Sequence, residues 1–160
     1  MDQEAKKTVL RQLTYGLYAV TARHGDERGV FTANWLSQAS FEPPLVMVSV
    51  EIDSSTLPII RQSGRFTVCP LVTGQKELAG ALGRPKKRAG DKFETVGLEV
   101  VETDAGDLAL AVSLGYVVCK VRWEMPAGDS VVILGEVVEA RVLDEGDSLT
   151  MREAGFRHAG

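Results

Sequence analysis

The chain has 160 residues and a formal net charge of -4, which suits one domain with a substantial hydrophobic core. This acidic balance excludes the basic surface on which nucleic-acid binding depends. No apolar run approaches the roughly 20 residues of a membrane-spanning helix, and no apolar leader follows the charged N-terminus. We therefore expect a single domain over residues 1–160, located in the cytoplasm, with neither nucleic acid nor membrane as a partner.

Hydrophobic periodicity and turn residues predict short helices among strands in the first half of the chain. The expected elements are a helix over 3–14, strands over 17–22, 30–40 and 45–51, a helix from Ser54 to 62, a strand over 65–71, a helix over 73–82 and a loop over 84–94. Residues 45–51 are almost free of polar side chains, which predicts a strand buried on both faces. Ser54 is the expected N-cap of its helix, and Gly64 the residue that ends it.

The last third of the chain is expected to be all strand. Apolar and polar residues alternate over 117–124, which places Val117, Cys119, Val121 and Trp123 on one buried face. After a turn at 126–129, a long strand over 131–143 is expected to turn Val138, Ala140 and Val142 inward, and Glu139 and Arg141 outward. Many apolar strands and few helices predict a mainly β fold, an antiparallel barrel that is closed or nearly closed.

Polar residues run through the segment 32–40, which otherwise has the pattern of a strand. Polar groups in a central strand are costly unless each finds a partner. The carbonyls and ring nitrogens of a flavin could supply such partners, and Trp35 could flank the ring. Trp35 is equally an ordinary core or interface residue.

Three hydroxyl residues, Ser54, Ser55 and Thr56, open the helix that follows the third strand. The unpaired N–H groups of a helix start, with hydroxyls beside them, can bind a phosphate. Simple helix capping explains the same residues, and Glu51 and Asp53 would repel a dianion. Both interpretations stay open from spacing alone.

Other residues with chemical potential are isolated. Cys69 and Cys119 each lie in an apolar strand without a neighbouring Cys or His, so buried packing is favoured over a redox or metal role. The basic run 84–88 is either a solvated loop or a contact for an anion such as the 2′-phosphate of a nicotinamide cofactor. No grouping predicts a metal site or a catalytic nucleophile, and catalytic residues are not identified.

Together these segments resemble the flavin reductase-like, FMN-binding split-barrel family, which includes short-chain flavin reductases and flavoredoxins. The matching segments are 15–21 (YGLYAVT), 29–35 (GVFTANW), 40–45 (SFEPPL), 53–56 (DSST), 63–66 (SGRF), 91–93 (DKF), 127–129 (AGD), 134–137 (LGEV) and 156–160 (FRHAG). They span nearly the whole chain in order.

The resemblance implies a mainly β, antiparallel Greek-key split barrel with a few short flanking helices, assembled as a homodimer with FMN near the subunit interface. It implies that the flavin contacts are Thr32, Ala33, Asn34, Trp35, Ser37, Ser40, Ser54, Ser55, Thr56, Lys92 and Phe93. Among these, Ser54, Ser55 and Thr56 would hold the phosphate, and Lys92 is the candidate cation for the charge that develops on the reduced ring. The implied activity is electron transfer from NADH or NADPH to bound or free flavin, with a redox protein or an oxygenase as a possible partner.

One position departs from the family pattern. Many reductases of the family have Gly-Asp-His in the turn before the last long strand, where this chain has Gly128-Asp129-Ser130. That His is associated with the use of nicotinamide. The alternative is therefore a flavoredoxin-like electron-transfer protein that holds FMN without using NAD(P)H directly. A binding module of the same fold that has lost flavin is a third possibility.

Overall fold

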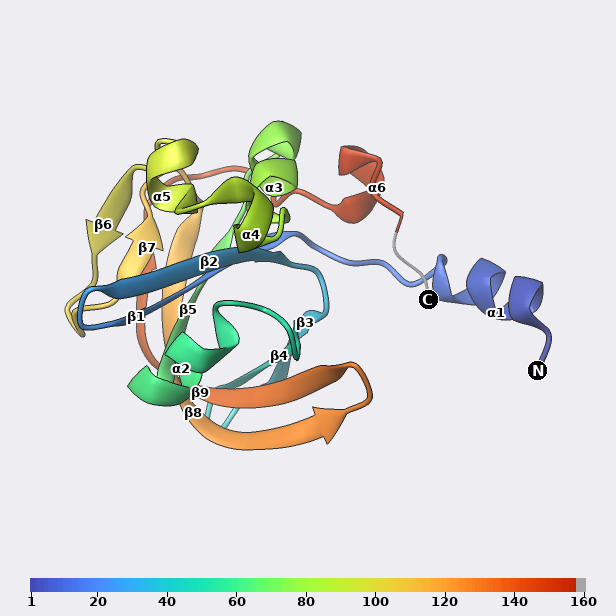
Figure 1. The fold of residues 1–160 in the computed structure, drawn as a ribbon, viewed down its shortest axis with the longest axis horizontal. Coiled ribbons are helices and arrows are strands. Elements are labelled where there is room, and N and C mark those ends of the chain that lie inside the picture. Colours follow the sequence, from blue (N-terminus) through green and yellow to red (C-terminus); the bar gives the residue numbers. More distant parts are fainter. Residues whose placement is uncertain (158–160) are drawn as a thin grey trace.

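The computed structural model describes residues 1–157 and is mainly β (Figure 1). His158, part of the last matching segment, lies outside the described residues. The strands are β1 (Tyr18–His24), β2 (Glu27–Ala33), β3 (Leu36–Ser40), β4 (Leu45–Glu51), β5 (Arg65–Pro70), β6 (Val100–Glu102), β7 (Leu108–Leu110), β8 (Gly115–Ala127) and β9 (Ser130–Val142). The helices are α1 (Gln3–Leu10), α2 (Leu57–Ser63), α3 (Lys76–Leu82), α4 (Lys86–Ala89), α5 (Lys92–Thr95) and α6 (Met151–Ala154).

Seven strands form one antiparallel sheet in the order β2-β1-β5-β8-β9-β4-β3, and β6 and β7 form a separate hairpin. The two edge strands, β2 and β3, are consecutive in the chain and joined only by Asn34 and Trp35. The backbone N–H of Ser49 in β4 donates to the carbonyl of Trp35 at 2.9 Å, so the sheet curls until its two edges lie close together. The predicted antiparallel barrel with a few short helices is confirmed.

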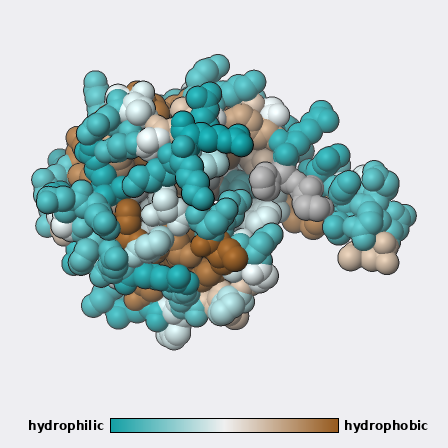
Figure 2. Space-filling view, in the orientation of Figure 1, coloured by the Kyte–Doolittle hydropathy of each residue, from teal (hydrophilic) through white to brown (hydrophobic). Residues whose placement is uncertain are grey.

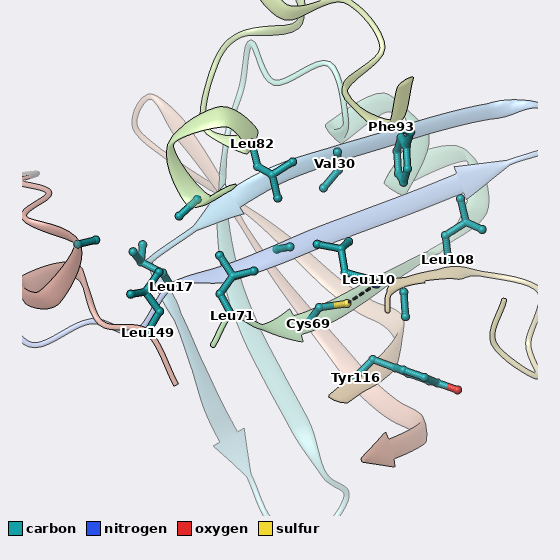
Figure 3. Close-up of a cluster of buried hydrophobic side chains, with 14 of the residues drawn as sticks. Leu17, Val30, Cys69, Leu71, Leu82, Phe93, Leu108, Leu110, Tyr116 and Leu149 are labelled. Atoms are coloured by element: carbon teal, nitrogen blue, oxygen red, sulfur yellow. Dashed lines mark hydrogen bonds between the residues drawn. The ribbon is translucent and has the colours of Figure 1, made fainter. Parts of the chain in front are cut away.

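The central strands β1 and β5 are buried on both faces. Val20 of β1 and Val68 of β5 face the barrel interior, where they join Phe66 and the residues of α2. Ala19 and Cys69 face the other way, into a second cluster under α3, α5 and β7 (Figure 3). Each fully buried large apolar side chain contributes about 1.5–3 kcal/mol, so both faces of these strands anchor the elements that surround the barrel.

Close packing leaves room only for glycine at position 135 of β9. A Cβ atom added at Gly135 would lie 2.6 Å from the ring of Phe66 and 2.8 Å from Cβ of Cys119. Both side chains are fully buried, so neither has room to move aside. Gly135 thus allows β9 to approach β5 and β8 across the barrel.

The first three helices differ from the prediction in their bounds. The N-cap of α2 is Thr56 rather than Ser54, while Gly64 ends the helix in the left-handed conformation (φ 67°), as predicted. The expected helix over 3–14 ends at Leu10, and that over 73–82 begins only at Lys76. The expected loop over 84–94 contains two single-turn helices, α4 and α5, because Asp91 caps the second one through the backbone N–H of Phe93.

Three predictions of strand faces are wrong. Strand β4 is buried on one face only, since Met47 is 37% exposed. In β9, Val138 and Val142 are exposed and Ala140 is too, whereas Glu139 is only half-exposed. Trp123 of β8 is 61% exposed. Register shifts between Val118 and Cys119 and between Val121 and Trp123 break the two-residue alternation on which the predictions rested.

The described helices include none that is both long and apolar enough to span a membrane. Helix α1 has no buried residue and projects from the barrel (Figure 1).

Candidate functional site

The edge strand β2 organises the region in which most of the predicted site residues lie. A sheet edge presents unpaired backbone groups, which a soluble protein has to cover. From Gly29 to Asn34, over a distance of about 17 Å, this edge meets several covering elements in turn. Gly29 is the first: a Cβ there would lie 2.7 Å from Oγ1 of Thr56. Thr56 is 1% exposed, so its side chain seals α2 against β2.

Lys92 covers the next residue of the edge. Its ammonium donates to the carbonyl of Val30 in β2 at 3.1 Å and to that of Leu82 in α3. Burial lowers the pKa of this amine from its usual 10.5. The ammonium is thus occupied by protein carbonyls, and its expected contact with a flavin stays a prediction that this conformation does not display.

Phe93 is also buried, and Arg28 of β2 stacks on its ring with 4.8 Å between the guanidinium carbon and the ring centroid. Arg28 donates to Oδ2 of Asp91 at 2.8 Å. Burial raises the pKa of Asp91, but hydrogen bonds from Arg28 and the Phe93 backbone outweigh it and hold that pKa below 3.8. This cluster pins α5 to β2.

Thr32 and Asn34 complete the covered edge. The hydroxyl of Thr32 donates to the carbonyl of Ala79 in α3 at 2.6 Å. The amide nitrogen of Asn34 contacts the sulfur of Met151 in α6 at 3.0 Å. No other hydrogen bond of the Asn34 side chain occurs within residues 1–157, so its carbonyl oxygen is available to a ligand.

The opposite edge, β3, is open. Ser37 is exposed and Ser40 half-exposed, and the ring of Trp35 is 37% exposed. The hydroxyl of Ser37 bonds only locally, to the carbonyl of Gln38 at 3.0 Å. Ala33, in contrast, is buried at the end of β2 and has only its backbone to offer. The run over 32–40 therefore divides into a covered half and an open half.

The hydroxyl-rich loop before α2 differs from residue to residue. Ser54 is half-exposed and its hydroxyl accepts from the backbone N–H of Thr56 at 3.4 Å. Ser55 is exposed and makes no side-chain hydrogen bond to any described residue. These two hydroxyls can bind a phosphate, whereas that of Thr56 is buried. Glu51 and Asp53 are exposed.

The donor set suits a flavin nucleotide. An amide carbonyl, several hydroxyls and a half-exposed indole offer hydrogen bonds and a stacking surface to a heteroaromatic ring, and Ser54 and Ser55 offer donors to a phosphate. The residues present thus fit the cofactor that the resemblance implies.

The remaining expectations concern residues away from this edge. Both cysteines are buried, and burial raises the pKa of Cys69 to about 11 and that of Cys119 to about 12, which keeps them as thiols. No cluster of potential metal ligands occurs in the described part of the chain. The basic run 84–88 is exposed.

Sequence comparison decides the family. Residues 10–160 match the model of the flavin reductase like domain. This chain belongs to that family. It is 33% identical over 156 residues to the reductase component of 4-hydroxyphenylacetate 3-monooxygenase from Thermus thermophilus, covering 97% of this chain and 95% of that protein. It is also 32% identical over 148 residues to the actinorhodin polyketide dimerase of Streptomyces coelicolor, covering 91% and 80%.

Solved structures agree. An NADH:FAD oxidoreductase from Streptomyces globisporus superposes with a TM-score of 0.84 at 25% identity, covering 99% of this chain and 94% of that one. The flavin reductase PheA2 gives 0.81 at 25% identity, covering 100% and 99%. The predicted family and enzyme class, an oxidoreductase that works on flavin, are confirmed.

Several residues that shape this region have no signal in the sequence. The Asn34–Met151 contact joins residues 117 positions apart, and the Thr32–Ala79 bond joins residues 47 apart. Neither Met151 nor Ala79 carries a motif. Only the fold shows that α3 and α6 meet the edge of β2.

Proposed function

We propose that this protein is an NAD(P)H:flavin oxidoreductase that binds FMN along the edges of β2 and β3 and passes reduced flavin to an oxygenase. The observation that carries the proposal is the open set of polar groups at the junction of β2 and β3, in a chain of the flavin reductase like family. The oxygenase rests on a relative that is itself the reductase component of a monooxygenase. The whole of residues 1–160 is proposed as one domain.

Each predicted site residue has a role that follows from its position. A bound flavin would supply the hydride-accepting ring, so the protein has to bind, orient and exclude water. Asn34 and Ser40 would hydrogen-bond the polar edge of the ring, and Trp35 would limit its movement on one side. Ser54 and Ser55 would hold the phosphate. The backbone of Ala33, and α5 through Lys92 and Phe93, would keep β2 in place behind the ring.

A homodimer would cover the apolar outer face of the sheet. Met47 of β4, Leu134 of β9 and Trp123 of β8 are cross-strand neighbours, and Met47 and Trp123 are 37% and 61% exposed. A hydrophobic patch is visible over β3 and β4 (Figure 2). Contiguous apolar surface of this kind is typical of an interface, and a second subunit bound to it would lie next to the open edge of β3.

The test is spectroscopic and kinetic. We expect the purified protein to bind FMN with micromolar or better affinity and to oxidise NADH or NADPH when FMN is added. A protein that binds neither FMN nor FAD contradicts the proposal. For the dimer, light scattering should give twice the chain mass for the wild type and a lower mass for Trp123→Ser, with Lys120→Ser, on the same strand, as the control.

An electron carrier is the second candidate. The chain is 30% identical to a high molecular weight rubredoxin from Moorella thermoacetica, of which it spans 64%. Ser130 is buried and its hydroxyl donates to Asp129, so it projects no titratable group from the turn before β9. A protein that holds FMN firmly but is not reduced by NADH or NADPH would favour this candidate.

A further inference from the structure

A cavity of about 360 Å³ lies between the segment that follows α1 and the helix α6. Its volume falls in the range of small-molecule sites, about 300–1,000 Å³. Three arginines line it, Arg11 from the first wall and Arg152 and Arg157 from the second. It is separate from the open edge of β3 and from the loop that carries Ser54 and Ser55.

The positive charge of this cavity is uncompensated by described residues. None of the residues that line it is acidic, and none of its three arginines forms an ion pair within residues 1–157. The acid closest in sequence, Glu153 of α6, accepts from the backbone N–H of Gly74 at 3.0 Å and from the hydroxyl of Thr73 at 3.2 Å. Guanidinium groups without a partner favour a bound anion, and phosphate accepts their paired donors best.

The other walls suit a ring rather than an inorganic ion. Tyr15 and Phe156 bring aromatic side chains to the cavity, and Leu13 adds an apolar one. The backbone N–H of Met151 donates to the backbone carbonyl of Tyr15 at 3.0 Å, which joins the two walls. The backbone N–H of Phe156 in turn donates to the carbonyl of Met151 at 3.0 Å. Aromatic rings stack on nucleobases with little preference for the base.

The cavity adjoins the covered edge of β2. Met151 lines it and also contacts the amide of Asn34 at 3.0 Å. Phe156 lies against α3, since a Cβ on Gly80 would meet its ring at 3.7 Å. A ligand here would therefore lie one side chain away from the residue proposed to bind the flavin ring.

We infer that this cavity binds the adenosine diphosphate half of a dinucleotide, with the arginines on the phosphates and Tyr15 and Phe156 beside the base. The inference rests on the proposed function, because the other half of the dinucleotide has to reach the site at Asn34. Two dinucleotides share this chemistry: NAD(P)H as the reductant, and FAD as the flavin.

The test uses ADP as the probe, with calorimetry on the full chain. We expect ADP to bind the wild type and to bind Arg152→Ala/Arg157→Ala at least tenfold more weakly. Arg141→Ala, on the exposed end of β9, is the matched control and should leave ADP binding unchanged. Lys87→Ala/Arg88→Ala tests the rival basic run, and a loss of ADP binding there with none in the arginine variant would overturn the inference.

Two further measurements on the same arginine variant show which dinucleotide, NAD(P)H or FAD, places its adenosine diphosphate half in the cavity. A raised KM for NADH or NADPH with an unchanged Kd for FMN assigns the cavity to the reductant. A loss of affinity for FAD but not for FMN assigns it to the flavin. ADP binding that depends on the arginines, with neither dinucleotide affected, would contradict the inference.

These experiments distinguish a wrong inference about the cavity from a wrong proposed function. An arginine variant that binds ADP, FAD and NAD(P)H as tightly as the wild type does removes the cavity inference alone. A wild-type protein that binds no flavin removes the proposed function, whatever ADP does. All three arginines are exposed, so we expect the melting temperatures of the variants to lie close to that of the wild type.

Discussion

The two edge strands of the sheet differ in whether other elements cover them. Along β2, contacts with α2, α3 and α5 close the edge from Gly29 to Thr32, and Met151 of α6 reaches Asn34. Along β3, no described helix covers the strand, a register shift interrupts it between Gln38 and Ser40, and Phe41 beyond it is 89% exposed. The protein completes one edge itself. It leaves the other open, which is why the proposed function assigns the flavin and a second subunit to β3.

The largest expected effect follows from breaking the cover of β2. Lys92→Met leaves two buried carbonyls without their donor, and we expect it to lower the free energy of unfolding by about 3 kcal/mol. Urea denaturation measures this. Lys87→Met, on the exposed face of α4, is the control and should change stability by less than about 0.5 kcal/mol. Equal stability of Lys92→Met and the wild type would show that β2 does not need this lysine.

Substitutions in the exposed loop before α2 should change the affinity for FMN rather than the stability of the protein. Ser54→Ala/Ser55→Ala removes two available hydroxyls, and we expect the Kd for FMN to rise more than tenfold, about 1.4 kcal/mol, with an unchanged melting temperature. Fluorescence titration of FMN measures this. Ser148→Ala, an exposed serine remote from the loop, is the matched control. Retained FMN affinity would mean that the phosphate binds elsewhere.

Two interior strands extend the comparison to buried hydroxyl groups, one with a hydrogen-bond partner and one without. Oγ1 of Thr67 has no hydrogen-bond partner in the described structure, whereas Oγ1 of Thr21, its neighbour across β1 and β5, donates to the carbonyl of Leu108 at 2.5 Å. We expect Thr67→Val to stabilise the protein by about 1 kcal/mol and Thr21→Val to destabilise it by a similar amount. Chemical denaturation of the two variants measures both. Destabilisation by Thr67→Val would contradict the assignment.

The smallest effect concerns acid stability at the Arg28 end of β2. The pKa of Asp91 is lower in the folded protein than its usual 3.8. The stability that this carboxylate contributes is therefore present above pH 3.8 and is lost as the pH falls through the folded value. Because the pair is partly exposed, we expect less than about 1 kcal/mol. Asp91→Asn should lose this part of the pH dependence between pH 2 and 4, and Glu94→Gln, which removes the more exposed partner of Arg28, should keep it.

Much of the fold follows from local pattern. The strands β1, β4, β5, β8 and β9, the helix that ends at Gly64 and the turn at 126–129 were predictable because turn residues and apolar runs act over a few residues. The single strand expected over 30–40 is instead two edge strands, β2 and β3, and the hairpin of β6 and β7 was not predicted. The orientation of side chains late in β9 was not. Glu139 turns toward the protein because it accepts the hydroxyl of Tyr116 at 2.8 Å and the backbone N–H groups of Asp104 and Ala105. These partners are distant in sequence.

The candidate site was predictable as a set of segments but not as a geometry. Nothing local to Thr56, Lys92 or Phe93 shows that their side chains are buried, because each is buried by a strand or helix far along the chain. The roles of the eleven expected flavin contacts remain predictions. The structure shows that Met151 contacts Asn34 and also lines the arginine-lined cavity.

Gly135 has a consequence for how this sequence can change. Its neighbours Leu134 and Glu136 face outward and are half-exposed, and many substitutions there should leave the fold intact. At Gly135 itself, every codon change that introduces a side chain drives an atom into Phe66 and Cys119. A saturation library of β9 selected for soluble expression should therefore recover only glycine at position 135, between two positions that accept many residues.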